Sequence, residues 1–146
     1  MTLVIESQKA LVSRFYEEFW NERNFEAIEE IMTEDVVFRG SLGMDMEGHA
    51  GVIRYAEMVF DAFPDFHNAL EEMIAEDGKL AACLTYSGTH EGEIFGIPGT
   101  GNPIRYVGTA IFIFTGELIS HCWVLGDRLE LLRQIGRDDD QTEDDI

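Results

Sequence analysis

The stretch IRYVGTAIFIFTGELISHCWVLGD, residues 104–127, contains two runs of β-branched and aromatic residues that flank Gly116-Glu117. Such residues fit the pleated surface of a sheet, and a two-residue loop with glycine first favours a tight hairpin. The sequence therefore predicts two antiparallel strands, one over 104–114 and one over 118–127.

A two-residue loop at Gly116-Glu117 also predicts the register of this hairpin, because it places Thr115 opposite Leu118. Counting outward, the predicted pairs are Phe114 with Ile119, Phe112 with His121, Ala110 with Trp123, Gly108 with Leu125 and Tyr106 with Asp127. At Trp123 and Leu125 a large side chain then faces a small one, which suits a packed or ligand-lined face. A three-residue loop would instead pair Asp127 with Arg105.

The opposite face of the hairpin is mostly apolar as well. In the predicted register it carries Val107, Thr109, Ile111, Ile113, Ser120, Cys122 and Val124. The helices of the chain can cover one face of the sheet, but three short helices do not suffice for two faces. We therefore expect a homodimer that packs sheet to sheet.

Helices are predicted in the first half of the chain, where apolar residues recur at spacings of three and four. They cover 6–20, 25–32 and 48–63, with a short strand at 36–38, and a last helical turn or two is predicted at 129–135. A hairpin of strands 67–75 and 80–89 turns at Asp77-Gly78. This order predicts an α+β domain, a cone in which three N-terminal helices pack on a strongly curved antiparallel sheet and enclose one pocket.

The length of 146 residues fits one domain, placed at 1–136, followed by an acidic tail at 137–146 that is expected to be disordered.

The formal net charge of -19 makes nucleic acid and membrane surfaces poor partners. The start, MTLVIESQKA, lacks the pattern of a signal peptide, so we expect a cytoplasmic protein. Cys83 and Cys122 lie in apolar strands and are expected to be buried, reduced thiols, the alternative being a disulfide.

Asp127 ends the last predicted strand, and two roles are open for it. It can cap the following helix by accepting backbone N–H bonds, or it can act as a catalytic acid and base. His121 is six positions away, about 20 Å along a strand, so the two side chains cannot form a dyad. His121 is then either a hydrogen-bonded core residue or a pocket residue.

Metal and cofactor sites are not predicted. The four histidines, at 49, 67, 90 and 121, lie far apart without metal-ligand spacing. The chain also lacks the GxSxG, GxxxxGKS/T and strand-GxGxxG-helix motifs of hydrolases and nucleotide-binding proteins.

Three longer segments carry a family likeness: LVSRFYEEFWNERNFEAIEEIMTEDVVF at 11–38, GTHEGEIFGIPGTGNPIRYVGTAIFIF at 88–114 and GELISHCWVLGDRLELLRQIG at 116–136. Together they resemble the SnoaL-like polyketide cyclase (ester cyclase) family of the NTF2-like superfamily. The resemblance implies an α+β cone that is usually dimeric. It also implies an aldol condensation that closes the last ring of an aromatic polyketide methyl ester, without metal or cofactor, through a pocket aspartate.

By this resemblance, Asp127 matches the pocket aspartate, and Tyr16 and His121 match pocket-lining positions. The chain departs from the family pattern at Gly99, where a second proline is common. It departs again at Phe38-Arg39, where a histidine or aspartate is common.

The expected function is a cofactor-free cyclase acting on a polyketide-like or other small apolar carbonyl substrate. Asp127, with its pKa raised by an apolar pocket, would take a proton from carbon and donate it to the new alkoxide, and His121 is the second catalytic candidate. The predicted substrate-binding residues are Phe15, Tyr16, Phe19, Trp20, Tyr106, Phe112 and Trp123. The alternatives are a non-catalytic dimer that binds a small apolar ligand and an epoxide hydrolase-like enzyme, which needs two carboxylates and an arginine.

Overall fold

The computed structural model describes residues 2–136, so the predicted acidic tail at 137–146 lies outside the described residues. The helical segments are α1 (Thr2–Arg14), a π-helix (Phe15–Asn21), a 3₁₀ turn (Phe25–Ala27), α2 (Ile28–Ile31), α3 (Gly48–Ala62) and α4 (Arg128–Gln134). The strands are β1 (Met32–Arg39), β2 (Asp45–Glu47), β3 (His67–Glu76), β4 (Lys79–Thr89), β5 (Pro103–Thr115) and β6 (Leu118–Gly126). None of the helices in this range is both long and apolar enough to cross a membrane.

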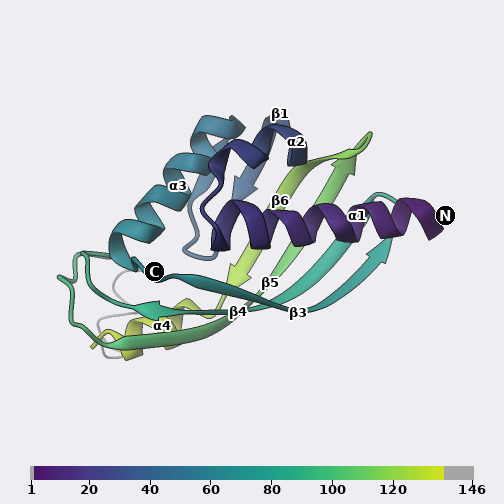
Figure 1. The fold of residues 1–146 in the computed structure, drawn as a ribbon. Coiled ribbons are helices and arrows are strands. Elements are labelled where there is room, and N and C mark those ends of the chain that lie inside the picture. The colour runs from purple at the N-terminus through teal and green to yellow at the C-terminus, as the bar shows by residue number, and fades with distance from the viewer. Residues whose placement is uncertain (1, 137–146) are drawn as a thin grey trace.

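The strands form one six-stranded sheet in the order β2-β1-β6-β5-β4-β3. Helices α1, α2 and α3 lie on one face of this sheet, and α4 packs against β5 (Figure 1). The predicted α+β class is therefore confirmed. The sheet is mixed rather than wholly antiparallel, because β1 pairs parallel with β6. This pair joins segments from opposite ends of the chain, and the residue pattern of either strand alone does not reveal it.

The helix predicted at 6–20 begins earlier and changes type at Phe15. A π-helix uses wider turns, closed by hydrogen bonds between residues five apart. Four aromatic residues are buried in this one segment, namely Phe15, Tyr16, Phe19 and Trp20. The rings of Phe15 and Phe19 stack with their centroids 5.3 Å apart. The wider turn thus brings a compact aromatic cluster to the core.

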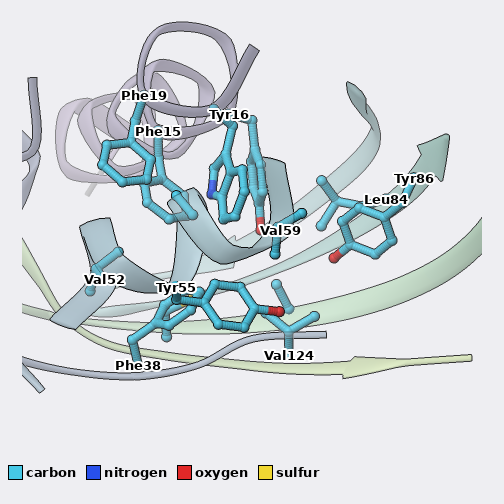
Figure 2. Close-up of a cluster of buried hydrophobic side chains, with 14 of the residues drawn as sticks. Phe15, Tyr16, Phe19, Phe38, Val52, Tyr55, Val59, Leu84, Tyr86 and Val124 are labelled. Carbon is cyan, nitrogen blue, oxygen red and sulfur yellow. The ribbon is translucent and has the colours of Figure 1, made fainter. Parts of the chain in front are cut away.

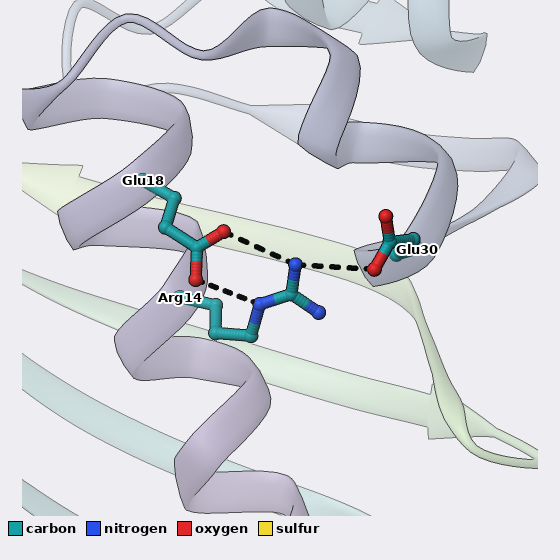
Figure 3. Close-up of polar contacts among 3 residues, drawn as sticks. All are labelled: Arg14, Glu18 and Glu30. Carbon is teal, nitrogen blue, oxygen red and sulfur yellow. Dashed lines mark hydrogen bonds and ion pairs between the residues drawn. The ribbon is translucent and has the colours of Figure 1, made fainter.

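Arg14 links this aromatic segment to α2. Its guanidinium donates to both carboxylate oxygens of Glu18, at 2.8 and 3.1 Å, and to Glu30 at 3.2 Å (Figure 3). The hydrogen bonds between Arg14 and Glu18 raise the pKa of the guanidinium and lower that of the carboxyl. The side chains of these ion pairs are partly exposed, so the contact contributes little to stability.

The β5–β6 hairpin begins in the predicted register and then departs from it. The first two pairs, from Thr115 and Phe114, are as predicted, but Ile113 then pairs with His121 rather than Ser120. Ser120 is the extra residue of a β-bulge. Its hydroxyl accepts from Thr115 Oγ1 at 2.9 Å and donates to the carbonyl of Ile113 at 3.2 Å. These bonds replace backbone pairing at the point where the ladder is interrupted.

The bulge reverses the faces of β6 beyond Ser120, because successive side chains of a strand point to opposite faces. The inward residues are Cys122 and Val124, and the outward residues are His121, Trp123 and Leu125. Trp123 is 45% exposed and Leu125 is 59% exposed. The prediction that His121 and Trp123 point into the pocket is therefore wrong.

The sheet face turned away from α1, α2 and α3 is uncovered in the single chain, and we refer to it as the outer face. Its exposed apolar residues include Val37, Val107, Ile111, Ile113, Trp123 and Leu125. Cys83 lies on the same side, opposite Thr109, and is exposed. The expectation of a buried thiol is thus confirmed for Cys122 and wrong for Cys83.

Candidate functional site

An aromatic cavity lies between the helices and the inner face of the sheet. It is lined by Phe15, Tyr16, Trp20, Phe38, Gly40, Ser41, Tyr55, Val59, Phe66, Asn68, Tyr86 and Val124. Aromatic rings meet edge to face around it, as Trp20 and Tyr55 do with their centroids 6.0 Å apart. The free space is about 20 Å³, which is room for about one water molecule.

Three phenols, those of Tyr16, Tyr55 and Tyr86, are among the polar groups that line this cavity. Figure 2 shows the hydroxyls of Tyr55 and Tyr86 turned toward the centre of the aromatic cluster. The backbone N–H of Leu42 donates to the Tyr55 hydroxyl at 3.1 Å. The Tyr16 hydroxyl is buried and has no hydrogen-bond partner within residues 2–136. The cavity therefore contains at least one donor whose capacity is unused.

Burial keeps these phenols protonated. Loss of solvation raises the pKa of Tyr55 to about 12 and raises the pKa values of Tyr16 and Tyr86 well above that of a solvated phenol. The pKa of Cys122, which faces inward from β6, is raised for the same reason. The described residues that line the cavity include no carboxylate and no imidazole. At neutral pH the lining thus offers neutral O–H donors rather than a charged acid or base.

The predicted substrate-binding residues fall into three groups. Phe15, Tyr16 and Trp20 line the cavity. Phe19, Tyr106 and Phe112 are buried one layer behind it, and the Tyr106 and Ser41 hydroxyls share a hydrogen bond of 2.8 Å. Trp123 lies outside on the outer face.

The sequence did not indicate Tyr55 or Tyr86 as site residues. Tyr55 belongs to the buried face of α3, and Tyr86 to the buried face of β4. The sequence did indicate that both tyrosines are buried, because each one falls in the regular spacing of apolar residues along its own helix or strand. Only the fold shows that these two faces meet.

Asp127 lies outside the cavity. Its Oδ1 accepts the backbone N–H of Glu130 at 3.2 Å, which makes Asp127 the N-cap of α4. The side chain is exposed and borders two surface depressions, one of them on the outer face. The expectation that Asp127 projects into an apolar pocket is wrong, because the cap directs its carboxyl to the first turn of α4. Its catalytic role, like that of His121, stays a prediction.

Two substitutions separate the cap from the charge of Asp127. Asp127→Ala removes the accepting oxygen and is expected to lower the free energy of unfolding by about 1 kcal/mol. Asp127→Asn keeps an accepting oxygen and is expected to retain nearly all of the stability. Urea unfolding of both variants measures the difference, and equal losses would contradict the cap.

The connection between β4 and β5 is closed by His90, a buried residue. Its Nδ1 accepts the backbone N–H of Thr100 at 3.3 Å and lies 2.9 Å from Thr100 Oγ1. Accepting a backbone N–H requires Nδ1 to be unprotonated, so a neutral ring carries its proton on Nε2. This contact holds the two ends of the loop together. Residues 2–136 contain no group of three or more His, Cys, Asp or Glu that could hold a metal ion.

Comparison with known proteins gives a consistent picture. Residues 10–135 match the family described as SnoaL-like polyketide cyclase. No protein with a curated description matches the chain.

Among solved structures, a protein from Jannaschia sp. CCS1 that is assigned to the SnoaL-like polyketide cyclases superposes with a TM-score of 0.84 at 18% identity, over 92% of this chain and 95% of that one. TsrD from Streptomyces laurentii superposes with a TM-score of 0.80 at 24% identity, over 90% of this chain and 96% of that one. IdmH from Streptomyces antibioticus superposes with a TM-score of 0.77 at 20% identity, over 89% of this chain and 99% of that one. At these identities the superpositions show a common fold.

Proposed function

The chain belongs to the SnoaL-like polyketide cyclase family, and on this basis we propose that its aromatic cavity binds a small, flat carbonyl compound. The lining is mostly aromatic and its polar groups include three phenols. Flat aromatic walls suit a flat ligand, and O–H donors suit a ligand that carries accepting oxygens.

The buried hydroxyl of Tyr16 is the observation that carries this proposal. An unpartnered buried polar group costs about 1–3 kcal/mol, so folded proteins satisfy nearly all such groups. Tyr16 is 2% exposed, and its hydroxyl has no partner within the described range, 2–136. A ligand carbonyl that accepts from this hydroxyl would remove the cost.

Binding requires the cavity to enlarge. Its free space of about 20 Å³ is far below the roughly 150 Å³ that accommodates benzene in an engineered protein cavity. Two hydrogen bonds hold the loop at 40–44 against the cavity. They join Ser41 to Tyr106 at 2.8 Å and Leu42 to Tyr55 at 3.1 Å. We propose that release of these two bonds accompanies ligand binding.

Ring closure by intramolecular aldol condensation is the second candidate function. The buried phenols favour it, because O–H donors held in a dry cavity stabilise an enolate oxygen as charge develops on it. The reaction also needs a base, and the described lining residues supply no carboxylate or imidazole. Asp127, the candidate from the sequence, caps α4 on the surface. Ligand binding therefore stands first, and the epoxide hydrolase alternative, which needs two carboxylates around a water, has no support from this lining.

Tyr16→Phe tests the proposed ligand contact. Removing an unpartnered hydroxyl is expected to raise the free energy of unfolding by about 1 kcal/mol. The same change is expected to weaken binding of methyl 2-naphthoate, a flat carbonyl probe, by about 10-fold. Urea unfolding and isothermal titration calorimetry measure the two effects.

Tyr106→Phe is the matched control, because the Tyr106 hydroxyl is already bonded to Ser41. This variant is expected to lose about 1 kcal/mol of stability and, because binding no longer has to break this bond, to bind the probe at least as tightly as the unmodified chain. A loss of stability in Tyr16→Phe equal to that in Tyr106→Phe would contradict the proposal.

We further propose that two copies of the chain pair through their outer faces. Monomeric proteins rarely expose a large contiguous apolar surface, and this face combines strands β1, β5 and β6. Trp123 is its largest side chain and, at 45% exposure, retains much of its surface for a partner. Tryptophan is among the residues that contribute most to protein interfaces.

A further inference from the structure

Two arginines converge beside the loop at 40–44. A β-carbon placed on Gly43 would lie 2.7 Å from Arg128 Nη1 and 3.5 Å from Arg39 Nη2. Both guanidinium groups therefore lie close to the backbone of Gly43 and to each other. Arg128 is held there by donating to the carbonyl of Leu42 at 3.1 Å. Arg39 lies over the ring of Trp123, with its guanidinium carbon 5.5 Å from the ring centroid.

Within residues 2–136, neither of these arginines forms an ion pair with a carboxylate. Asp45 lies across from Arg39 on β2, and Asp127 borders the same depression. The ion pairs within residues 2–136 nevertheless both come from Arg14. The two positive charges lie side by side and repel each other. The chain has 29 acidic residues, yet no described carboxylate forms an ion pair with either arginine. An anion shared by both guanidinium groups would remove this repulsion.

The depression between the arginines adjoins the aromatic cavity. It measures about 240 Å³ and is lined by Arg39, Ser41, Gly43, Val124, Leu125, Gly126, Asp127, Arg128, Leu129 and Leu132. Ser41 and Val124 line both this depression and the aromatic cavity. The two spaces share these walls, so the opening of the loop at 40–44 that the proposed function requires would let a single ligand reach from the aromatic rings to the two arginines.

From this placement we infer that Arg39 and Arg128 bind the anionic group of the ligand whose flat part occupies the aromatic cavity. A carboxylate is the class that fits, because guanidinium groups hold carboxylates through paired, charge-assisted hydrogen bonds. The ligand is then an aromatic or polyketide-like acid rather than a neutral ester. This inference rests on the proposed function, since the cavity must hold the ligand's ring.

A matched acid and ester test the inference. The probes are 2-naphthoate and methyl 2-naphthoate, titrated at constant ionic strength into the full chain labelled with 5-fluorotryptophan. Trp20 lines the cavity and Trp123 contacts Arg39, so the two fluorine signals report on the ring and on the charged group separately. We expect the ester to shift the Trp20 signal, and the acid to shift both signals and bind about 10-fold more tightly.

Arg39→Gln is expected to weaken binding of the acid by about 10-fold and to change binding of the ester less than twofold. Arg128→Gln also removes a hydrogen bond to the loop at 40–44, so it is expected to weaken binding of the acid relative to that of the ester by about 10-fold. Arg54→Gln is the control, because it removes the same charge from an exposed position on α3. Equal affinities for acid and ester in the unmodified chain would overturn the inference. So would acid binding that neither arginine variant weakens.

Inorganic phosphate separates failure of the inference from failure of the proposed function. If neither naphthalene probe shifts Trp20, the proposed function fails. A saturable shift of Trp123 by phosphate that disappears in Arg39→Gln would then still support an anion site at the arginine pair. If phosphate also leaves Trp123 unshifted, the inference is overturned as well.

Discussion

Gly92→Ala is expected to lower the free energy of unfolding by about 3 kcal/mol or more. A β-carbon at this position would lie 2.1 Å from the carbonyl oxygen of Asp61 and 3.2 Å from the Cα of Ala62. Both contacts are with backbone, so no side-chain rotation can relieve them. The loop would have to move away from the end of α3 and give up two hydrogen bonds to the Ala62 carbonyl, from Glu91 at 2.9 Å and from Gly92 at 3.0 Å.

Urea unfolding followed by circular dichroism measures this loss. Gly51→Ala is the matched control, because Gly51 is a helical residue of α3 and its nearest contact would be Met46 at 3.3 Å. Alanine is favoured over glycine in a helix by about 1 kcal/mol, which offsets a mild contact, so the control should remain near the stability of the unmodified chain. An unfolding midpoint for Gly92→Ala equal to that of Gly51→Ala would show that the loop does not dock on α3 as described.

Trp123→Glu is expected to weaken the proposed dimer by about 1000-fold. The substitution occurs once in each copy of a symmetric interface, and it replaces the largest apolar side chain of the outer face with a charge. Within its own chain Trp123 makes a cation–π contact with Arg39 and is 45% exposed, so the fold should persist. Sedimentation velocity at micromolar concentrations should show a dimer for the unmodified chain and a monomer for the variant.

Val4→Glu controls for the added charge in this experiment. Val4 is exposed to a similar extent but belongs to α1, on the opposite side of the sheet. This variant should sediment as the unmodified chain does. A monomeric unmodified chain, or a dimer that survives Trp123→Glu, would contradict pairing through the outer face.

The sequence predicted those parts of the fold that depend on local pattern. The Asp77-Gly78 turn joins β3 and β4 as expected, and α3 begins at Gly48 and ends before Pro64 as expected. The parallel pairing of β1 with β6 was not predicted, because it depends on contacts between segments about eighty residues apart. The π-helix was not predicted either, since its aromatic spacing is compatible with an ordinary amphipathic helix.

The candidate site was predicted in part, and the errors at His121 and Trp123 on β6 share one cause. Phe15, Tyr16 and Trp20 line the cavity as helical spacing predicted, whereas Phe19 is buried behind them. On β6 both faces are mostly apolar, so hydrophobicity could not show which one is buried. The extra residue at Ser120 settled that choice through hydrogen bonds that a pattern of residue types does not encode.

Gly99 shows that a departure from the family pattern can be structural. A β-carbon there would lie 2.1 Å from the carbonyl oxygen of Glu91, so the backbone leaves no room for the proline that is common at this position. The difference therefore reflects how tightly this chain folds its β4–β5 loop. It gives no information about the chemistry of the ligand.

The bulge at Ser120 also limits how roles can be transferred between relatives. A relative that lacks the additional residue would present, at the same alignment column, a side chain on the opposite side of the strand. An insertion or deletion of one codon at this point can exchange interior and exterior positions along the whole remainder of the strand, whereas point substitutions alter them singly. Columns downstream of residue 120 are therefore comparable between homologues only after this offset has been counted.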